Sequence, residues 1–392
     1  MSEKTALSCI LLKNASVYAP EALGEQDVLI AGGKILSIGK NLSTASFDED
    51  DMKVIDCNGA IVTPGFIDAH IHMLGGGGGA GYGSRASELK PSEAFLAGTT
   101  TIIGCLGIDT VTRNMMQMVA KARSSHERYL NVFCVDGGLD LPIHTLTGSL
   151  REDMFLIPEI IGVGEPAISD KRSSQVTADD LTKLVADVHV AGRLSGKMGF
   201  VQFHLGDTST GIQPLFDILP NVLIKHIIPL HCNRNPQVLS EAPAWAEKGG
   251  VIDVTVPLFP PAYKLGKSVP DSIEYFKTQG VDIRKITISS DGNGVSTLFG
   301  KDYIHRFPLN ILYNDVKLLV ERGIDIAEAV SYVTSNVADG YDMQTKGRIK
   351  PGKDADVLVI DPKTFTLKDV VSCGHVVVEN GVALPPPYGI DA

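Results

Sequence analysis

The feature that most constrains this fold is a regular alternation of short β-branched runs with helical segments between Ile61 and about Gly323. The repeat is roughly 30 residues long, which is the length of one strand–helix–strand unit. The predicted strands are Val62–Ile71, Thr99–Leu106, Leu130–Val135, Ile160–Gly164, Phe200–Leu205, Ile227–Cys232, Val251–Val256 and Ile286–Ser290. Eight such units favour a closed (β/α)8 barrel of the TIM type over an open sheet.

Helices are predicted between these strands, where Leu, Val, Ala and Met recur at helical spacing. The clearest are Val111–Arg123, Ala178–Leu194, Val238–Lys248, Ser268–Gln279 and Leu309–Arg322.

The two ends of the chain carry short strand-like runs instead, with turn signals at Gly32-Gly33 and Asn380-Gly381. Each end alone has too few strands to bury a core. We therefore predict one small β-sandwich built from residues 1–62 and 347–392, beside a barrel domain of residues 63–346. Two independent β extensions are the alternative.

The composition of the chain limits its expected binding partners and its cellular location. The 35 Lys and Arg residues against 46 Asp and Glu give a net charge of −11, which argues against nucleic acid or an anionic membrane as partner. No apolar run reaches the roughly 18 residues of a membrane span. The six Cys residues lack CxxC pairing, which is typical of reduced, buried thiols in a cytoplasmic protein. Cys232 adjoins His231, but neighbours on a strand point to opposite faces, so a structural role is favoured.

The strongest chemical signal is His70-Ile71-His72 at the carboxyl end of the first barrel strand. Alternation along a strand places both imidazoles on one face, where they can bind one metal ion together. A lone His would more often be a satisfied core or surface residue. The spacing at a strand end favours ligation instead.

Further polar residues end other predicted strands: Glu165 the fourth, His204 the fifth, His231 the sixth and Asp291 the eighth. In a barrel these ends share one rim, which is where catalytic residues lie. This donor set suits Zn²⁺, while Mn²⁺, Fe²⁺ or Ni²⁺ are compatible with it. One or two ions are possible, with Glu165 as the bridge between two; its alternative role is an exposed loop carboxylate.

These residues, in this order, resemble the metal-dependent amidohydrolase superfamily, and within it most closely the isoaspartyl (β-aspartyl) dipeptidases. The resemblance runs almost end to end. It is carried by Leu12–Pro20, Pro64–Asp68, Gly75–Gly79, Gly104–Gly107, Thr147–Ser149, Ala167–Asp170, His231–Asn235, Ser289–Gly294 and Pro351–Val357. It implies a barrel with a flanking β-sandwich, a metal-dependent amide hydrolysis and a homo-oligomer.

The sequence departs from that family at the expected metal bridge. Where the family has a carboxylated Lys on the fourth strand, this chain has Glu165 and one extra residue. A Glu carboxylate is about three bonds closer to its backbone than a lysine carbamate. Glu165 reaches the same position only if the strand end moves inward, and the inserted residue can supply that shift.

The substrate pocket departs further. By alignment with the family, Gly79 replaces a Glu that binds the free amino group, Leu139 a Tyr that polarises the carbonyl, and Val295 a Ser. Arg172 and Arg234 are kept. A guanidinium recognises carboxylates in a bidentate way, so an acidic small-molecule substrate is expected. A surface salt bridge is the alternative role of each Arg.

The expected reaction is attack of a metal-activated hydroxide on an amide carbonyl, with Asp291 as proton carrier. Candidate substrates are β-aspartyl dipeptides and N-acyl amino acids. The alternatives are hydrolysis of a cyclic amide or deamination of a heterocycle, and a non-catalytic superfamily member, against which the intact ligand set argues.

Overall fold

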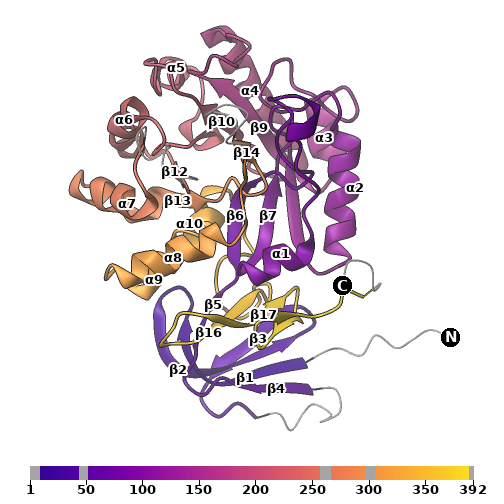
Figure 1. Ribbon diagram of the computed structural model, residues 1–392, viewed down its shortest axis with the longest axis vertical. Coiled ribbons are helices and arrows are strands. Elements are labelled where there is room, and N and C mark those ends of the chain that lie inside the picture. The colour runs from indigo at the N-terminus through magenta and orange to yellow at the C-terminus, as the bar shows by residue number, and fades with distance from the viewer. Residues whose placement is uncertain (1–8, 44–51, 257–265, 297–304, 388–392) are drawn as a thin grey trace, which may run out of the picture.

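Parallel strands surround the centre of the molecule in a computed structural model that describes residues 9–43, 52–256, 266–296 and 305–387 (Figure 1). Six strands form one hydrogen-bonded sheet in the order β11-β10-β9-β8-β7-β6, and two more form a second parallel pair. Their bounds are β6 Phe66–Ile71, β7 Thr99–Gly104, β8 Asn131–Asp136, β9 Ile160–Ile168, β10 Val201–Leu205, β11 Ile227–Leu230, β12 Ile252–Thr255 and β13 Ile286–Ser289.

Backbone contacts connect the two sheets at both ends. The N–H of Cys232, just after β11, donates to Asp253 in β12 at 2.9 Å, and Ile71 in β6 forms a parallel bridge with Gly292, just after β13. The strands therefore continue from β6 to β13 and return to β6, as in a TIM-like barrel.

Helices lie outside these strands (Figure 1). Their bounds are α1 Pro91–Leu96, α2 Met115–His126, α3 Leu150–Leu156, α4 Ala178–Ser195, α5 Gln213–Ile218, α6 Pro236–Glu247, α7 Val269–Thr278, α8 Ile311–Glu321, α9 Ile326–Ser331 and α10 Ser335–Gly340. Capping sets the ends: α4 begins after Thr177, which accepts the Asp180 N–H, and ends at the left-handed Gly196. The expected start of α2 at Val111 was too early, because Asn114 caps the helix by accepting the Gln117 N–H.

Strands from both ends of the chain form one nine-stranded terminal sheet below the barrel strands in Figure 1. The amino-terminal members are β1 Cys9–Tyr18, β2 Ala22–Ala31, β3 Lys34–Gly39, β4 Met52–Asp56 and β5 Ile61–Pro64. The carboxyl-terminal members are β16 Val357–Ile360, β17 Leu367–Ser372, β18 His375–Glu379 and β19 Val382–Ala383. β16 pairs antiparallel with β5, and Leu12, Val28, Val359 and Val371 from the two ends share one buried core.

The run Val62–Ile71, expected as one strand, is divided at Gly65. β5 belongs to the terminal sheet, whereas β6 begins the barrel sheet. A Cβ at Gly65 would lie 2.2 Å from the Thr100 hydroxyl, so only glycine fits where the chain passes from one sheet to the other.

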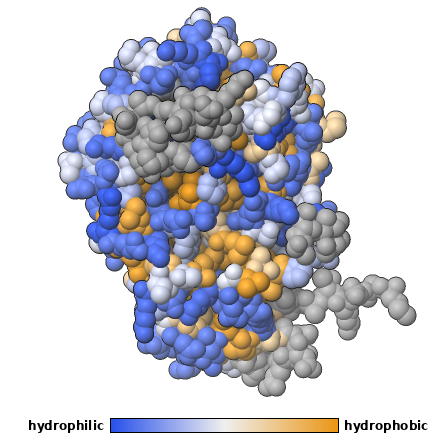
Figure 2. Space-filling model, viewed as in Figure 1, coloured by the Kyte–Doolittle hydropathy of each residue, from blue (hydrophilic) through white to orange (hydrophobic). Residues whose placement is uncertain are grey.

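The viewed face is mostly hydrophilic, with apolar patches near the terminal sheet (Figure 2). Exposed apolar side chains of that sheet include Leu36 in β3 and Val54 in β4. The expected homo-oligomer stays a prediction. Within the described residues, no helix combines the length and apolar character needed to cross a membrane.

A buried ion pair joins the terminal sheet to the barrel. Lys346 Nζ lies 2.7 Å from Asp356 Oδ2, and both residues are under a tenth exposed. The other oxygen, Asp356 Oδ1, accepts from Asn131 Nδ2 in β8 and from the Cys373 N–H beside β17. One carboxylate thus binds both parts of the molecule.

We expect Lys346→Ala to lower the free energy of unfolding by about 3–5 kcal/mol, because it leaves a buried carboxylate without its cation. Urea denaturation followed by circular dichroism measures this change. Lys363→Ala removes an exposed lysine and serves as control. Equal stability of the two variants would show that the ion pair does not hold the sheets together.

Candidate metal centre

Two groups of potential ligand atoms lie at the carboxyl ends of the barrel strands. One comprises His70, His72, Cys105 and Glu165, and the other Glu165, His204 and His231. Within each group the atoms lie within 4.8 Å of one another. Glu165 belongs to both groups and therefore stands between them.

The spacing within the first group fits a tetrahedral ion. Zinc lies about 2.0–2.1 Å from nitrogen or oxygen ligands and about 2.3 Å from sulfur. In a tetrahedral site, two nitrogen or oxygen ligand atoms are therefore about 3.3 Å apart, and a sulfur and a nitrogen about 3.6 Å apart. His70 Nε2 lies 3.3 Å from Glu165 Oε2, and Cys105 Sγ lies 3.5 Å from His72 Nδ1 and 3.8 Å from His70 Nε2. The residues present therefore fit a bound metal.

The second group is more tightly spaced. His204 Nδ1 lies 3.0 Å from Glu165 Oε2 and 3.1 Å from His231 Nε2. Asp291 approaches the first group, with Oδ1 at 2.9 Å from His72 Nε2. The structure therefore brings together all six residues that the sequence predicted as ligands.

Outer contacts orient two of the imidazoles. Thr255 Oγ1 donates to Asp253, so it accepts from His231 Nδ1 at 2.7 Å and leaves Nε2 facing Glu165. Gln202 acts similarly on His70: its Nε2 donates to the Ala69 carbonyl, and its Oε1 lies 3.4 Å from His70 Nδ1. Such contacts fix which ring nitrogen is available to a metal.

A β-bulge directs Glu165 inward. Gln202 in β10 pairs with Gly164, but His204 pairs with Ala167, so Glu165 and Pro166 oppose the single residue between them. A bulge redirects a side chain at a strand end. The bulge in β9 lies where this chain has one more residue than the similar family. Glu165 is only 2% exposed, so it is not a carboxylate on an open loop.

The backbone is unusual at other ligand positions. His231 and Asp291 have φ of 63° and 52°, which costs free energy in residues other than glycine. A Cβ at Gly107 would lie 2.6 Å from the His72 ring, so the segment after β7 passes this ring only because a glycine stands there. Strain of this kind concentrates at functional sites.

Charge pairing keeps the carboxylates ionised. Burial alone would raise the pKa of Asp291, but the guanidinium of Arg234, with Nη1 at 2.9 Å, and the contact with His72 hold it well below its ordinary range. Burial likewise opposes ionisation of Glu165, yet its contacts with His70, His204 and His231 lower its pKa. Both side chains therefore present negative oxygens to a cation.

Cys105 was missed by the sequence interpretation, which took all six cysteines as structural. Burial raises the pKa of the Cys134 and Cys232 thiols. At Cys105 burial acts in the same direction, but His70 and His72 outweigh it and lower the pKa. A signal was present, because Cys105 lies at the carboxyl end of the second predicted strand, Thr99–Leu106, and so on the same rim.

Arg172 and Arg234 lie at the same rim. Arg172 binds Asp170 through Nε and Nη2 and approaches His204 Nε2 at 2.9 Å. Both arginines line a cavity of about 390 Å³ together with His204 and His231. Both therefore lie beside the ligand groups, and each also forms a salt bridge, Arg172 with Asp170 and Arg234 with Asp291; their role in substrate binding stays a prediction.

Leu139, Gly79 and Val295, the three positions that differ from the similar family, belong to neither ligand group. The Leu139 N–H donates to the Gly107 carbonyl, which places a buried apolar side chain near the first group. Gly79 is exposed beside Ile108, and Val295 packs against Gly77 in the glycine-rich loop.

The comparisons with known proteins agree with this geometry. The sequence profile of the amidohydrolase family matches residues 61–382. The chain belongs to the amidohydrolase family. A crystal structure of beta-aspartyl dipeptidase from Fervidobacterium islandicum AW-1, in complex with beta-Asp-Leu dipeptide, is 36% identical, with a TM-score of 0.89 over 96% of this chain and 98% of that one. The resemblance to isoaspartyl dipeptidases is thereby confirmed, and the chain is a hydrolase acting on carbon–nitrogen bonds.

Other proteins similar to this chain are named for reactions other than dipeptide hydrolysis. The adenine deaminase of Desulfatibacillum aliphaticivorans is 25% identical over 96% of this chain, which spans 60% of that protein's length. The D-hydantoinase of Geobacillus stearothermophilus is 30% identical over 50% of this chain and 39% of its own length. Membership of the family thus leaves the substrate open.

Asp136 is a further buried carboxyl at the end of β8, outside both ligand groups. Burial, and then the charge of Asp153, raise its pKa to about 9. Among the described residues, no group donates a hydrogen bond to either oxygen. Lys197, the cation that opposes this shift, directs its Nζ to three backbone carbonyls. A proton on Asp136 allows it to donate to the Asp153 carboxylate.

We expect Asp136→Asn to stabilise the protein increasingly as pH rises. The folded carboxyl keeps its proton up to about pH 9, whereas the unfolded one loses it near pH 4, so the wild type loses stability as pH rises across that window. The asparagine has no such dependence and can donate to Asp153. Urea unfolding at pH 5 and pH 8 measures the difference in free energy, which we expect to grow by about 4 kcal/mol between the two pH values, at about 1.4 kcal/mol per pH unit. A difference independent of pH would contradict the raised pKa.

Proposed function

We propose that this protein hydrolyses an amide bond in a small, carboxylate-bearing molecule, either a β-aspartyl dipeptide or an N-acyl amino acid, with a bound divalent metal. The observation that carries the proposal is the pair of ligand groups sharing Glu165, with two guanidiniums on the same rim. The likeness to a beta-aspartyl dipeptidase structure supports the same class of reaction.

The residues divide into metal holders and proton carriers. His70, His72, Glu165, His204 and His231 would hold one or two ions, for which Zn²⁺ is the best match by ligand type. Bound metal supplies the activation of water and the polarisation of the scissile carbonyl. A Glu bridge would replace the carboxylated Lys of the similar dipeptidases.

Asp291 would move the proton. Its Oδ1 faces the ligand group at His72, and its Oδ2 is held by Arg234, so the carboxylate is fixed beside the ligands that would hold the metal. It would accept a proton from water and deliver it to the leaving nitrogen. Leu139 offers no hydroxyl to the developing oxyanion, so the metal would carry that charge without help from this position.

The substrate's carboxylate would bind Arg172 or Arg234. Each guanidinium is already held by a carboxylate, which fixes its orientation and leaves part of its fork toward the cavity. Gly79 carries no acid to bind a free α-amine. This difference favours an N-acyl amino acid over a dipeptide with a free amino terminus.

Hydrolysis of a cyclic amide or deamination of a heterocycle is the second candidate. This candidate is supported by similarity to an adenine deaminase along almost the whole chain and to a D-hydantoinase along half of the chain. Such substrates need no carboxylate, so the two arginines separate the candidates.

The closure of the barrel, the cellular location and the oligomeric state are also proposals. We infer a closed (β/α)8 barrel with a terminal β-sandwich, supported by the contacts that continue the strands from β13 to β6. Mostly buried cysteines without CxxC spacing support a cytoplasmic location, and the likeness to isoaspartyl dipeptidases supports a homo-oligomer.

Cys105→Ser and Glu165→Ala should each disturb metal binding. We expect Co²⁺-loaded wild type to show a thiolate-to-cobalt charge-transfer band, which Cys105→Ser abolishes. Glu165→Ala should lower the metal-to-protein ratio, because the residue shared by both groups is lost. Absorption spectra and elemental analysis measure these effects.

Cys134→Ser is the matched control, since Cys134 is equally buried on the neighbouring strand β8 but has no contact with the ligand groups. If the band survives in Cys105→Ser, Cys105 is not a ligand. An unchanged ratio in Glu165→Ala would reject Glu165 as a shared ligand.

The substrate class is tested by assaying Zn²⁺- and Mn²⁺-loaded protein against β-aspartyl dipeptides, N-acyl amino acids and cyclic ureides. We expect cleavage of a carboxylate-bearing amide, with turnover reduced by orders of magnitude in Asp291→Asn at unchanged metal content. Arg172→Gln should raise KM for the acidic substrate more than it lowers kcat. Activity on cyclic ureides or heterocycles alone would reject the first proposal in favour of the second.

A further inference from the structure

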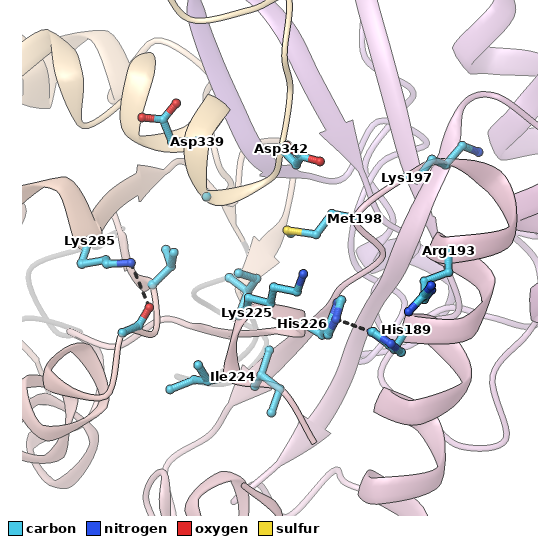
Figure 3. A pocket seen from close by; sticks show the side chains of 15 residues that line it. His189, Arg193, Lys197, Met198, Ile224, Lys225, His226, Lys285, Asp339 and Asp342 are labelled. Carbon is cyan, nitrogen blue, oxygen red and sulfur yellow. Dashed lines mark hydrogen bonds between the residues drawn. The ribbon is translucent and has the colours of Figure 1, made fainter. Parts of the chain in front are cut away.

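A second cavity, of about 520 Å³, opens at the opposite ends of the strands that carry His204 and His231 (Figure 3). Its walls come from the last half of α4, the 3-10 turn Ile224–His226 before β11, the segments before β12 and β13, and the end of α10. It shares no lining residue with the cavity at the metal centre.

Positive side chains surround this cavity in a chain whose net charge is −11. They are Arg193, Lys197, Lys225 and Lys285. Lys197 and Lys285 donate to backbone carbonyls. Within the described ranges, Arg193 and Lys225 have neither a carboxylate nor a hydrogen-bond acceptor as partner, and both are exposed.

The acidic residues of the wall leave this excess in place. Asp339 is bound by both Nη atoms of Arg348, so its charge is neutralised from outside the cavity. Asp342 accepts from Gln344 and is the one remaining negative side chain among the lining residues. The free cations therefore outnumber the uncompensated carboxylate.

Two histidines complete the polar side of the cavity. His226 is buried, and its Nδ1 donates to the Gly199 carbonyl at 2.7 Å. Its Nε2 therefore accepts from His189 Nδ1 at 2.5 Å, which fixes the His189 ring and leaves its Nε2 for another partner. Figure 3 shows the two rings side by side, with Arg193 on the same helix as His189 and Lys225 next to His226.

We propose that this cavity binds a small phosphate-bearing molecule, with the phosphate held by Arg193 and Lys225. A planar guanidinium on α4 and a point-like ammonium before β11 suit the three oxygens of a phosphate dianion better than the two of a carboxylate. Met198, Ile224 and Val251 supply an apolar wall for the rest of the molecule. The volume lies in the range of small-molecule sites, roughly 300–1,000 Å³.

The test is titration of the metal-loaded protein with inorganic phosphate at low ionic strength, followed by calorimetry. We expect saturable binding that weakens by at least about tenfold in the double variant Arg193→Gln/Lys225→Gln, because two charge-assisted contacts are lost. Lys183→Gln is the matched control, since it removes an exposed cation from the same helix α4 but outside this cavity.

The variants also separate this site from the metal centre. Phosphate binding that is equal in wild type and double variant lies elsewhere, for example at the metal, and would overturn the proposal. Absence of saturable binding would overturn it too. Equal weakening in Lys183→Gln would reduce the effect to general surface charge and would also reject the site.

Discussion

The carboxylate of Glu165 is the interaction on which the site depends. It lies within reach of four imidazoles from β6, β10 and the segments that follow β6 and β11, so it draws both ligand groups to one point. An ionised carboxylate with under a twentieth of its side chain exposed is costly unless cations or donors surround it. The bulge in β9 is what brings so short a side chain to this position.

Much of this site could be predicted from sequence because barrel geometry converts a position along the chain into a position in space. Residues that end parallel strands share a rim, so His70, His204, His231 and Asp291 were found without any knowledge of contacts. Strand periodicity also indicated the barrel strands. What it could not show was the break at Gly65, because that break depends on the contact with Thr100, a residue far along the chain.

Other features escaped prediction because they depend on three-dimensional surroundings. Cys105 and Cys134 both lie within apolar predicted strands, and only the imidazoles beside Cys105 distinguish them. Asp356 looks like an ordinary acidic residue in sequence, yet it joins Lys346 to the first residue of β8 and to the terminal sheet. Pairings between distant segments follow from packing, which local patterns do not encode.

The balance of charge at the rim connects metal number to substrate. Glu165, Asp291 and Asp170 contribute three negative charges, and a Cys105 thiolate a fourth, against the two positive charges of Arg172 and Arg234. With one divalent ion the rim would be neutral, and with two it would carry a net charge of +2. The net charge of the rim attracts an anionic substrate in the second case, whereas in the first the guanidiniums attract it alone. A carboxylate-bearing substrate and a centre of two ions bridged by Glu165 therefore support each other, whereas a neutral heterocycle is compatible with a single ion.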